Sequence, residues 1–188
     1  MRHREWIVMV GVLVSTASFA EEVCKPTPLS SPAVALDQFY KTAEAKAKAW
    51  KADAAPARLT GPIDAQGRST SWNMLFYSAT ADAHVEIDAA RGKMTCQARK
   101  GSAGRMPALV PDFFRDGAKL YEIAREQGGD HIARGYGVWV QTAAAPRDRH
   151  GTWNLSFSMQ EASGSTKSGN VTVIVDANTG KLEKALRN

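Results

Sequence analysis

The sequence predicts an α+β fold of two tandem α-β-β-β-β units, each with one helix packed on a four-stranded antiparallel sheet. Three observations support this prediction. Two stretches carry apolar residues at helical spacing, segments of alternating apolar and polar residues follow each of them, and short motifs recur in both halves of the chain. Residues 71–74 (SWNM) correspond to residues 152–155 (TWNL), and residues 88–94 (DAARGKM) correspond to residues 176–182 (DANTGKL).

Residues 1–20 have the features of a signal peptide that is removed on export. Arg2 and Arg4 give a positive start, residues 6–14 form an apolar run, and residues 18–20 (SFA) have the small-x-small pattern that signal peptidase cleaves. The apolar run is about half of the roughly 20 residues that a membrane-spanning helix needs. We therefore expect no stable membrane insertion after cleavage.

The chain that remains after cleavage is mildly basic. The formal net charge is +5, of which the signal peptide carries +1, so the mature chain keeps +4. Its basic residues are scattered and do not alternate with aromatic residues, as they do in many nucleic-acid sites. We therefore expect no nucleic-acid partner. The length fits one ordinary domain or two very small ones.

Two cysteines follow the signal peptide, Cys24 and Cys96. An even pair in an exported protein predicts a structural disulfide, because the chain folds in an oxidising compartment. A redox site would more often have a Cys-x-x-Cys motif, which is absent. Residues 21–23 (EEV) are not the small or apolar triplet that precedes a lipidated cysteine, so we expect Cys24 to carry no lipid.

The first half begins with an extended arm over residues 21–31, followed by the first unit over residues 32–99. Ser31 is the expected N-cap of its helix and Pro32 the first helical residue. The apolar face of this helix consists of Leu36, Phe39, Tyr40, Ala43, Ala47 and Trp50. The elements expected in this unit are a helix over 32–51 and strands over 57–63, 71–79, 85–87 and 93–97.

The second half begins with a linker over residues 100–111 and continues with the second unit over residues 112–188. We expect Gly128 and Gly129 to end its helix. The elements expected in this unit are a helix over 112–127 and strands over 135–142, 152–159, 171–175 and 181–186. The residues expected to form the structural core of the two units are Trp50, Trp72, Phe76, Trp153 and Phe157.

These residues resemble the PepSY-like domains, which are small extracytoplasmic modules of bacterial exported proteins and protease propeptides. The resemblance rests on residues 50–53 (WKAD) at a helix end, Gly67 with a Ser-Trp pair shortly after it, and residues 85–93 (VEIDAARGK). The tandem arrangement is more loosely similar to the two-repeat architecture of the β-lactamase inhibitory protein. Residues 127–130 (QGGD) depart from the PepSY pattern in the second half. The resemblance implies binding or inhibition outside the cytoplasm, without a catalytic residue.

We find no constellation of residues that predicts catalysis, a metal site or a cofactor. His84, His131 and His150 fall in different predicted elements, without a second ligand at metal-binding spacing. Residues 176–180 (DANTG) resemble the start of a calcium loop, but Lys181 stands where the EF-hand pattern requires glycine. The motifs of serine nucleophiles and of phosphate-binding loops are also absent.

Alternation along the strands predicts a second sheet face, opposite the helices. Its candidate partner-binding residues are Leu75, Tyr77, Trp139 and Ile174. We therefore expect a periplasmic or secreted, non-catalytic module that binds an unknown envelope or secreted protein, as an inhibitor would. The sister unit or the N-terminal arm could instead cover this face. Two other functions stay open: a small-ligand carrier with a cavity between helix and sheet, and an unrecognised hydrolase.

Overall fold

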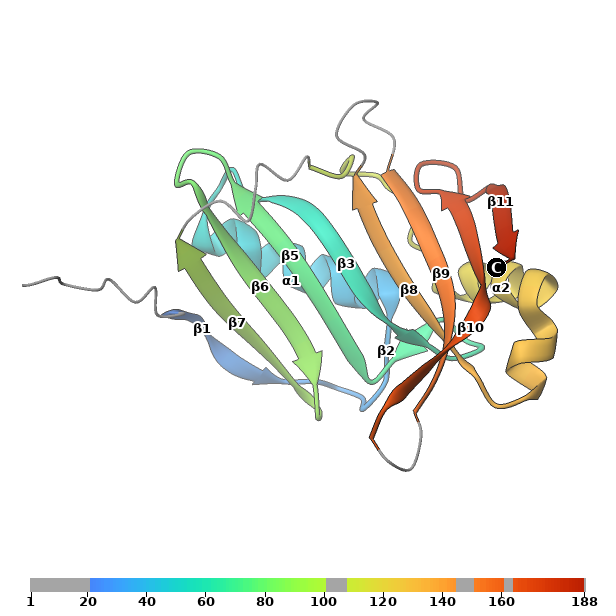
Figure 1. Cartoon of the computed structure of the whole chain (residues 1–188). Coiled ribbons are helices and arrows are strands. Elements are labelled where there is room, and N and C mark those ends of the chain that lie inside the picture. Colours follow the sequence, from blue (N-terminus) through green and yellow to red (C-terminus); the bar gives the residue numbers. More distant parts are fainter. Residues whose placement is uncertain (1–20, 101–107, 145–150, 161–163, 188) are drawn as a thin grey trace, which may run out of the picture.

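The computed structural model describes residues 21–100, 108–144, 151–160 and 164–187. The predicted signal peptide and most of the predicted linker lie outside the described residues, and so does His150. The described chain forms a nine-stranded sheet, a separate two-stranded sheet and two helices. Every strand pair of the large sheet is antiparallel, and its strands are ordered β1-β7-β6-β5-β3-β8-β9-β10-β11 (Figure 1).

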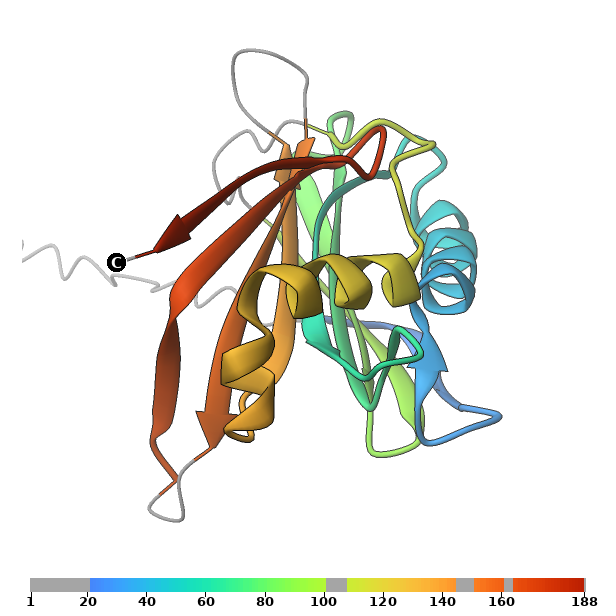
Figure 2. The same ribbon diagram turned by 90° about the vertical axis from the view of Figure 1, so that its right-hand side faces the viewer.

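The helices are α1 (Leu36–Trp50) and α2 (Gly117–Ala133). The strands of the large sheet are β1 (Glu21–Pro28), β3 (Ala55–Ile63), β5 (Ser71–Ser78), β6 (Ala83–Ala90), β7 (Lys93–Lys100), β8 (Gly137–Ala144), β9 (Gly151–Gln160), β10 (Thr166–Asp176) and β11 (Leu182–Arg187). The small sheet consists of β2 (Val34–Ala35) and β4 (Arg68–Ser69). Both helices lie on the same side of the large sheet (Figure 2).

The prediction of two units, each with its own four-stranded sheet, is wrong. The strands that follow α1 and those that follow α2 belong to a single sheet, because β3 pairs with β8. This pairing runs from Arg58 opposite Ala143 to Ile63 opposite Val138. Hydrogen bonds between strands use backbone groups that every residue except proline can supply, so the side-chain pattern of each half does not show whether its first strand will join another.

The start of α1 differs from the predicted one. The helix begins at Leu36, its N-cap is Ala35, and no side chain caps it. Ser31 and Pro32 precede the short strand β2 instead of starting the helix. The apolar face predicted for this helix is buried, except for Trp50, which is half-buried at its end.

The second helix continues through the glycines that we expected to end it. It begins after the N-cap Asp116, whose side chain accepts a hydrogen bond from the backbone N–H of Lys119 at 3.0 Å. Gly128 lies inside the helix with φ −141° and ψ 29°, which marks a kink. A Cβ at Gly128 would lie 2.2 Å from Cζ of Phe157. The glycine therefore makes room for the Phe157 ring, and the helix resumes beyond it.

The predicted N-terminal arm is largely a strand of the sheet. Over Glu21–Pro28 it pairs with β7 and forms one edge, with register shifts on both sides of the pair between Cys24 and Cys96. Most of its side chains are exposed, while Val23, Cys24 and Leu29 pack against the core. The arm therefore extends the sheet sideways and does not lie across its face.

The main core fills the space between the helices and one face of the sheet. Trp72, Phe76, Trp153 and Phe157 are each at most 1% exposed. They point to the helix side with the alternate residues of neighbouring strands, such as Ile87. The turns between strands follow local rules. Gly92, for example, has φ 72° after Arg91 at φ 51°, so both turn residues are in the left-handed region that a tight hairpin requires.

Candidate functional site: the uncovered face of the sheet

The face of the large sheet opposite α1 and α2 is crossed by no helix of the described chain (Figure 2). Strand register shows which side chains are neighbours on it. One row across the sheet runs through residues that lie directly opposite one another on successive strands: Thr95, Asp88, Asn73, Thr60, Gln141, Asn154 and Ile174. We call the outward-pointing residues of β3, β5, β6, β8, β9 and β10 the uncovered face. It is mostly polar, with a few apolar groups.

Trp139 is the most exposed aromatic residue of this face, at 37%. It lies on β8, opposite Pro62 on β3 and Ser156 on β9. Its indole Nε1–H donates to Oγ1 of Thr60 at 2.7 Å, and the Thr60 hydroxyl donates to the backbone carbonyl of Val140 at 3.1 Å. These two bonds hold the indole at the pairing of β3 with β8. The ring is therefore both exposed and fixed in orientation.

On the other side of β3 from Trp139, β5 and β6 carry a connected polar group. Nδ2 of Asn73 donates to Oε1 of Glu86 and to Oδ1 of Asp88, both at 2.7 Å. A guanidinium nitrogen of Arg58 lies 3.9 Å from Oε1 of Glu86. Burial raises the pKa of Asp88, the Glu86 charge raises it further, and the hydrogen bond from Asn73 opposes both effects. The arrangement holds two carboxylates in place beside each other.

Two buried polar atoms among the residues of this face have no hydrogen-bond partner in the described chain. They are Nε of Arg58 and Nδ1 of His84. His84 lies opposite Tyr77 on β5 and Arg99 on β7. Buried polar atoms are nearly always hydrogen-bonded. Both atoms have almost no solvent-accessible surface, so these two unpartnered groups lie within the protein and not at its surface.

The four residues that we predicted for partner binding differ in exposure. Trp139 is exposed, Tyr77 and Ile174 are half-buried, and Leu75 is only 4% exposed. The Tyr77 hydroxyl donates to Oδ1 of Asp82 at 2.8 Å. Leu75 and Ile174 lie on β5 and β10, which are four strands apart, or roughly 19 Å at the usual strand spacing. The structure therefore places them on one face but not in one apolar patch.

Sequence reasoning missed the polar contribution of Thr60, Arg58, Glu86 and Asp88 to this face. Alternation in residues 84–88 (HVEID) is a signal that could have shown that Glu86 and Asp88 share a face. The contact between Thr60 and Trp139 has no such signal, because it depends on the pairing of two strands that are far apart in the chain.

A surface hollow of about 510 Å³ lies elsewhere, where the N-terminal ends of α1 and α2 meet the turn at Gly67. Its charges are paired within the chain: Nε of Arg115 lies 3.3 Å from Oδ1 of Asp37, and the guanidinium stacks on Tyr40 at 4.3 Å. The Lys41 ammonium, with Arg115, lowers the pKa of Asp37, and burial raises the pKa of Tyr40 well above its ordinary value. These contacts join the two helix starts.

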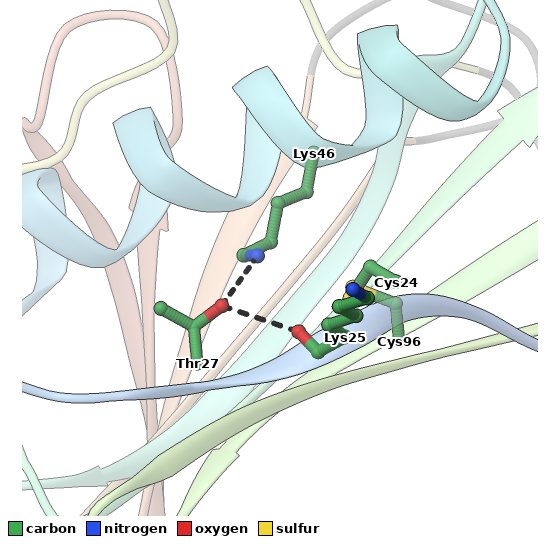
Figure 3. Close-up of a disulfide and its surroundings, with 5 residues drawn as sticks. All are labelled: Cys24, Lys25, Thr27, Lys46 and Cys96. Carbon is green, nitrogen blue, oxygen red and sulfur yellow. Dashed lines mark hydrogen bonds between the residues drawn. A yellow bond between two sulfur atoms is a disulfide. The ribbon is translucent and has the colours of Figure 1, made fainter.

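The predicted disulfide between Cys24 and Cys96 is confirmed. The two cysteines lie directly opposite each other on β1 and β7, and Cys96 is only 1% exposed. Figure 3 shows how β1 is also joined to the helix layer. Nζ of Lys46 on α1 donates to Oγ1 of Thr27 at 2.9 Å, and that hydroxyl donates to the carbonyl of Lys25 at 3.2 Å. Such a disulfide is typical of proteins that fold outside the reducing cytoplasm.

No group of three or more His, Cys, Asp or Glu residues that could hold a metal ion occurs among the described residues. None of the helices in the described ranges is long and apolar enough to cross a membrane.

The chain matches no model of a protein family, and no curated protein sequence matches it. The PepSY-like resemblance therefore stays a prediction. Among solved structures, the crystal structure of a predicted lipoprotein from Clostridium difficile 630 is similar to this chain. The TM-score is 0.50 at 12% sequence identity, and the match covers 79% of this chain and 92% of that one. At this identity the similarity shows a shared fold and nothing further.

Proposed function

We propose that this protein is a periplasmic or secreted, non-catalytic module whose uncovered sheet face binds an envelope or secreted protein, as an inhibitor would. The observation that carries the proposal is Trp139, 37% exposed and held by its hydrogen bond to Thr60. Tryptophan is enriched among the residues that dominate binding energy, and a ring already fixed in position loses little conformational entropy on binding.

The surroundings of Trp139 support a protein partner. Around the indole lie exposed or half-buried amide and hydroxyl groups, including Gln141, Asn154 and Ser156. An apolar centre with a polar rim is typical of non-obligate protein interfaces.

The proposed location follows from the predicted signal peptide and the disulfide between Cys24 and Cys96. The carrier hypothesis placed a ligand between helix and sheet. The hollow of about 510 Å³ lies instead between the two helix starts, where Arg115 and Asp37 are already paired. We therefore favour binding at the uncovered face.

The proposal can be tested by photocrosslinking from the two sides of the sheet. A photoreactive residue is introduced at Gln141, exposed on the uncovered face, or at Lys41, exposed on α1. We expect an adduct of one defined mass from Gln141 in envelope or culture-fluid fractions of the producing bacterium, and none from Lys41. Trp139→Ala should remove that adduct, whereas Tyr121→Ala on α2 should leave it. Equal labelling from both positions, or an adduct that survives Trp139→Ala, would contradict the proposal.

A further inference from the structure

The two edges of the large sheet differ in how they are protected. An edge strand presents unpaired backbone groups, and proteins usually block such edges with proline, bulges or charges. The edge strand β1 contains Pro26 and Pro28, which have no N–H to donate, and its register is interrupted twice. The opposite edge strand, β11, contains no proline, and its register shift lies at its first residues. From Lys184 to Arg187, β11 is an uninterrupted edge.

Exposed apolar side chains are concentrated on this same strand. Among the described residues, the exposed large apolar side chains are Trp139 at 37%, Leu182 at 42% and Leu186 at 43%. Two of these three belong to β11. Leu186 lies opposite Thr172 of β10, and Lys184 lies opposite Ile174, so both point to the uncovered face. Exposed leucines on an open edge are typical of strands that pair with another strand.

The charges of β11 are complementary to those of a second β11 in the opposite direction. With Ala185 opposite Ala185, each Lys184 lies opposite the partner's Leu186. Each Glu183, which is the residue at the register shift of β11 against β10, lies opposite the partner's Arg187. Glu183 and Lys184 form no ion pair with another described residue, and Arg187 makes one long contact, 3.3 Å, to the carbonyl of Gln127. Opposite charges in directly facing cross-strand positions stabilise antiparallel pairs.

We infer that β11 pairs with the β11 of a second copy of this chain, antiparallel and around a two-fold axis at Ala185. The sheets of the two copies then form one continuous sheet. In an antiparallel pair, residues that lie directly opposite each other point to the same face of the sheet. The uncovered faces of the two copies therefore lie on the same side of the joined sheet. The short strand predicts a weak, concentration-dependent dimer. A strand from a different protein would not share the self-complementary charges of β11, which is why we favour a second copy.

The test uses a charge exchange in the full mature chain with its disulfide intact. Glu183→Arg and Arg187→Glu each place like charges opposite each other in the dimer, so each single variant should dimerise about tenfold more weakly than the wild type. A one-to-one mixture of the two variants restores opposite charges, and so does the double variant. Both should dimerise as the wild type does. Sedimentation velocity over micromolar to millimolar protein concentrations gives the dissociation constants.

Matched controls are available on α2, where Glu126→Arg and Arg125→Glu make the same charge changes at exposed positions. They should leave the dissociation constant unchanged. Trp139→Ala should also leave it unchanged, which separates this inference from the proposed function. A wild type that stays monomeric at every concentration overturns the inference, and this includes the case in which β11 takes a strand of another protein. Single variants that self-associate as the mixture does would overturn it too.

Discussion

Trp72 and Trp153 occupy matching positions in the two halves of the described chain. Each donates its indole Nε1–H across 2.8 Å to a backbone carbonyl in the segment that leads into a helix, Val34 before α1 and Phe114 before α2. Trp72 is 1% exposed and Trp153 is 0% exposed. Each indole also lies beside a phenylalanine, Phe39 at 6.0 Å and Phe113 at 6.1 Å between ring centroids. The two tryptophans therefore join the sheet to the helix layer in the same way.

Replacing either indole should remove this connection. We expect Trp72→Phe and Trp153→Phe each to lower the free energy of unfolding by about 2–3 kcal/mol, because each leaves a buried carbonyl without its donor and opens a small cavity. Chemical denaturation monitored by circular dichroism gives the values. Trp50→Phe, at a half-buried position, is the control and should cost less than either. If Trp50→Phe lowers the free energy of unfolding as much as Trp72→Phe and Trp153→Phe do, the role assigned to the indole hydrogen bonds is contradicted.

The disulfide should make a large contribution to stability. Cys24 and Cys96 are separated by 72 positions in the sequence. In the chain-entropy model, closing a loop of this length stabilises the folded state by about 4 kcal/mol. The Cys24→Ala/Cys96→Ala double variant should therefore unfold at a much lower denaturant concentration than the oxidised wild type. The reduced wild type should behave like this variant, and an unchanged midpoint in both would show that β1 is held by its other contacts alone.

The two neighbouring glycines of α2 should respond in opposite directions to alanine. Gly128→Ala would place a Cβ 2.2 Å from the Phe157 ring, and we expect it to lower the free energy of unfolding by about 1–3 kcal/mol. Gly129 has open space at its Cβ position, so Gly129→Ala should raise the free energy of unfolding by about 0.5–1 kcal/mol through better helix propensity. Thermal denaturation of the two variants, compared with that of the wild type, measures both changes in stability. Equal effects would show that the kink does not depend on Phe157.

The Asp53 carboxylate should give stability a specific dependence on acid pH. It accepts hydrogen bonds from the backbone N–H of Thr80 at 3.0 Å and from the hydroxyls of Ser78 and Thr80 at 2.8 and 2.9 Å. The Thr80 backbone bond is the first cause that lowers the pKa of Asp53 from 3.8 to about 2. Because the folded-state pKa lies below the unfolded value, the stability from Asp53 is complete above about pH 4 and is lost as pH falls towards 2.

The variant Asp53→Asn tests this dependence. It should lose stability at neutral pH and should lose less than the wild type between pH 4 and pH 2, as measured by the thermal midpoint at each pH. The variant Asp82→Asn, on the turn before β6, is the control for a general charge effect. If the difference in thermal midpoint between the wild type and Asp53→Asn stays constant from pH 4 to pH 2, the hydrogen bonds at Asp53 do not cause the loss of stability in acid.

The sequence by itself determined the features that depend on near neighbours in the chain. The helical spacing in residues 36–50 shows the buried face of α1, and Gly92 shows the position of a hairpin. Alternation shows which residues of β9 are buried and places Trp72, Met74 and Phe76 of β5 in the core, but it does not show that Leu75 is buried too. The two cysteines that follow a predicted signal peptide also predict their disulfide correctly. Each of these depends on local geometry or on the compartment, and both can be inferred from residue types and spacing.

Only the tertiary structure decided how the two halves join and what the uncovered face contains. The pairing of β3 with β8 makes one sheet where we expected two, and it brings Thr60 to the indole of Trp139. The continuation of α2 past Gly128 likewise depends on the distant Phe157 ring. Strand pairing uses backbone groups common to nearly all residues, and close packing depends on partners far away in the chain. Neither leaves a signal in the local order of side chains.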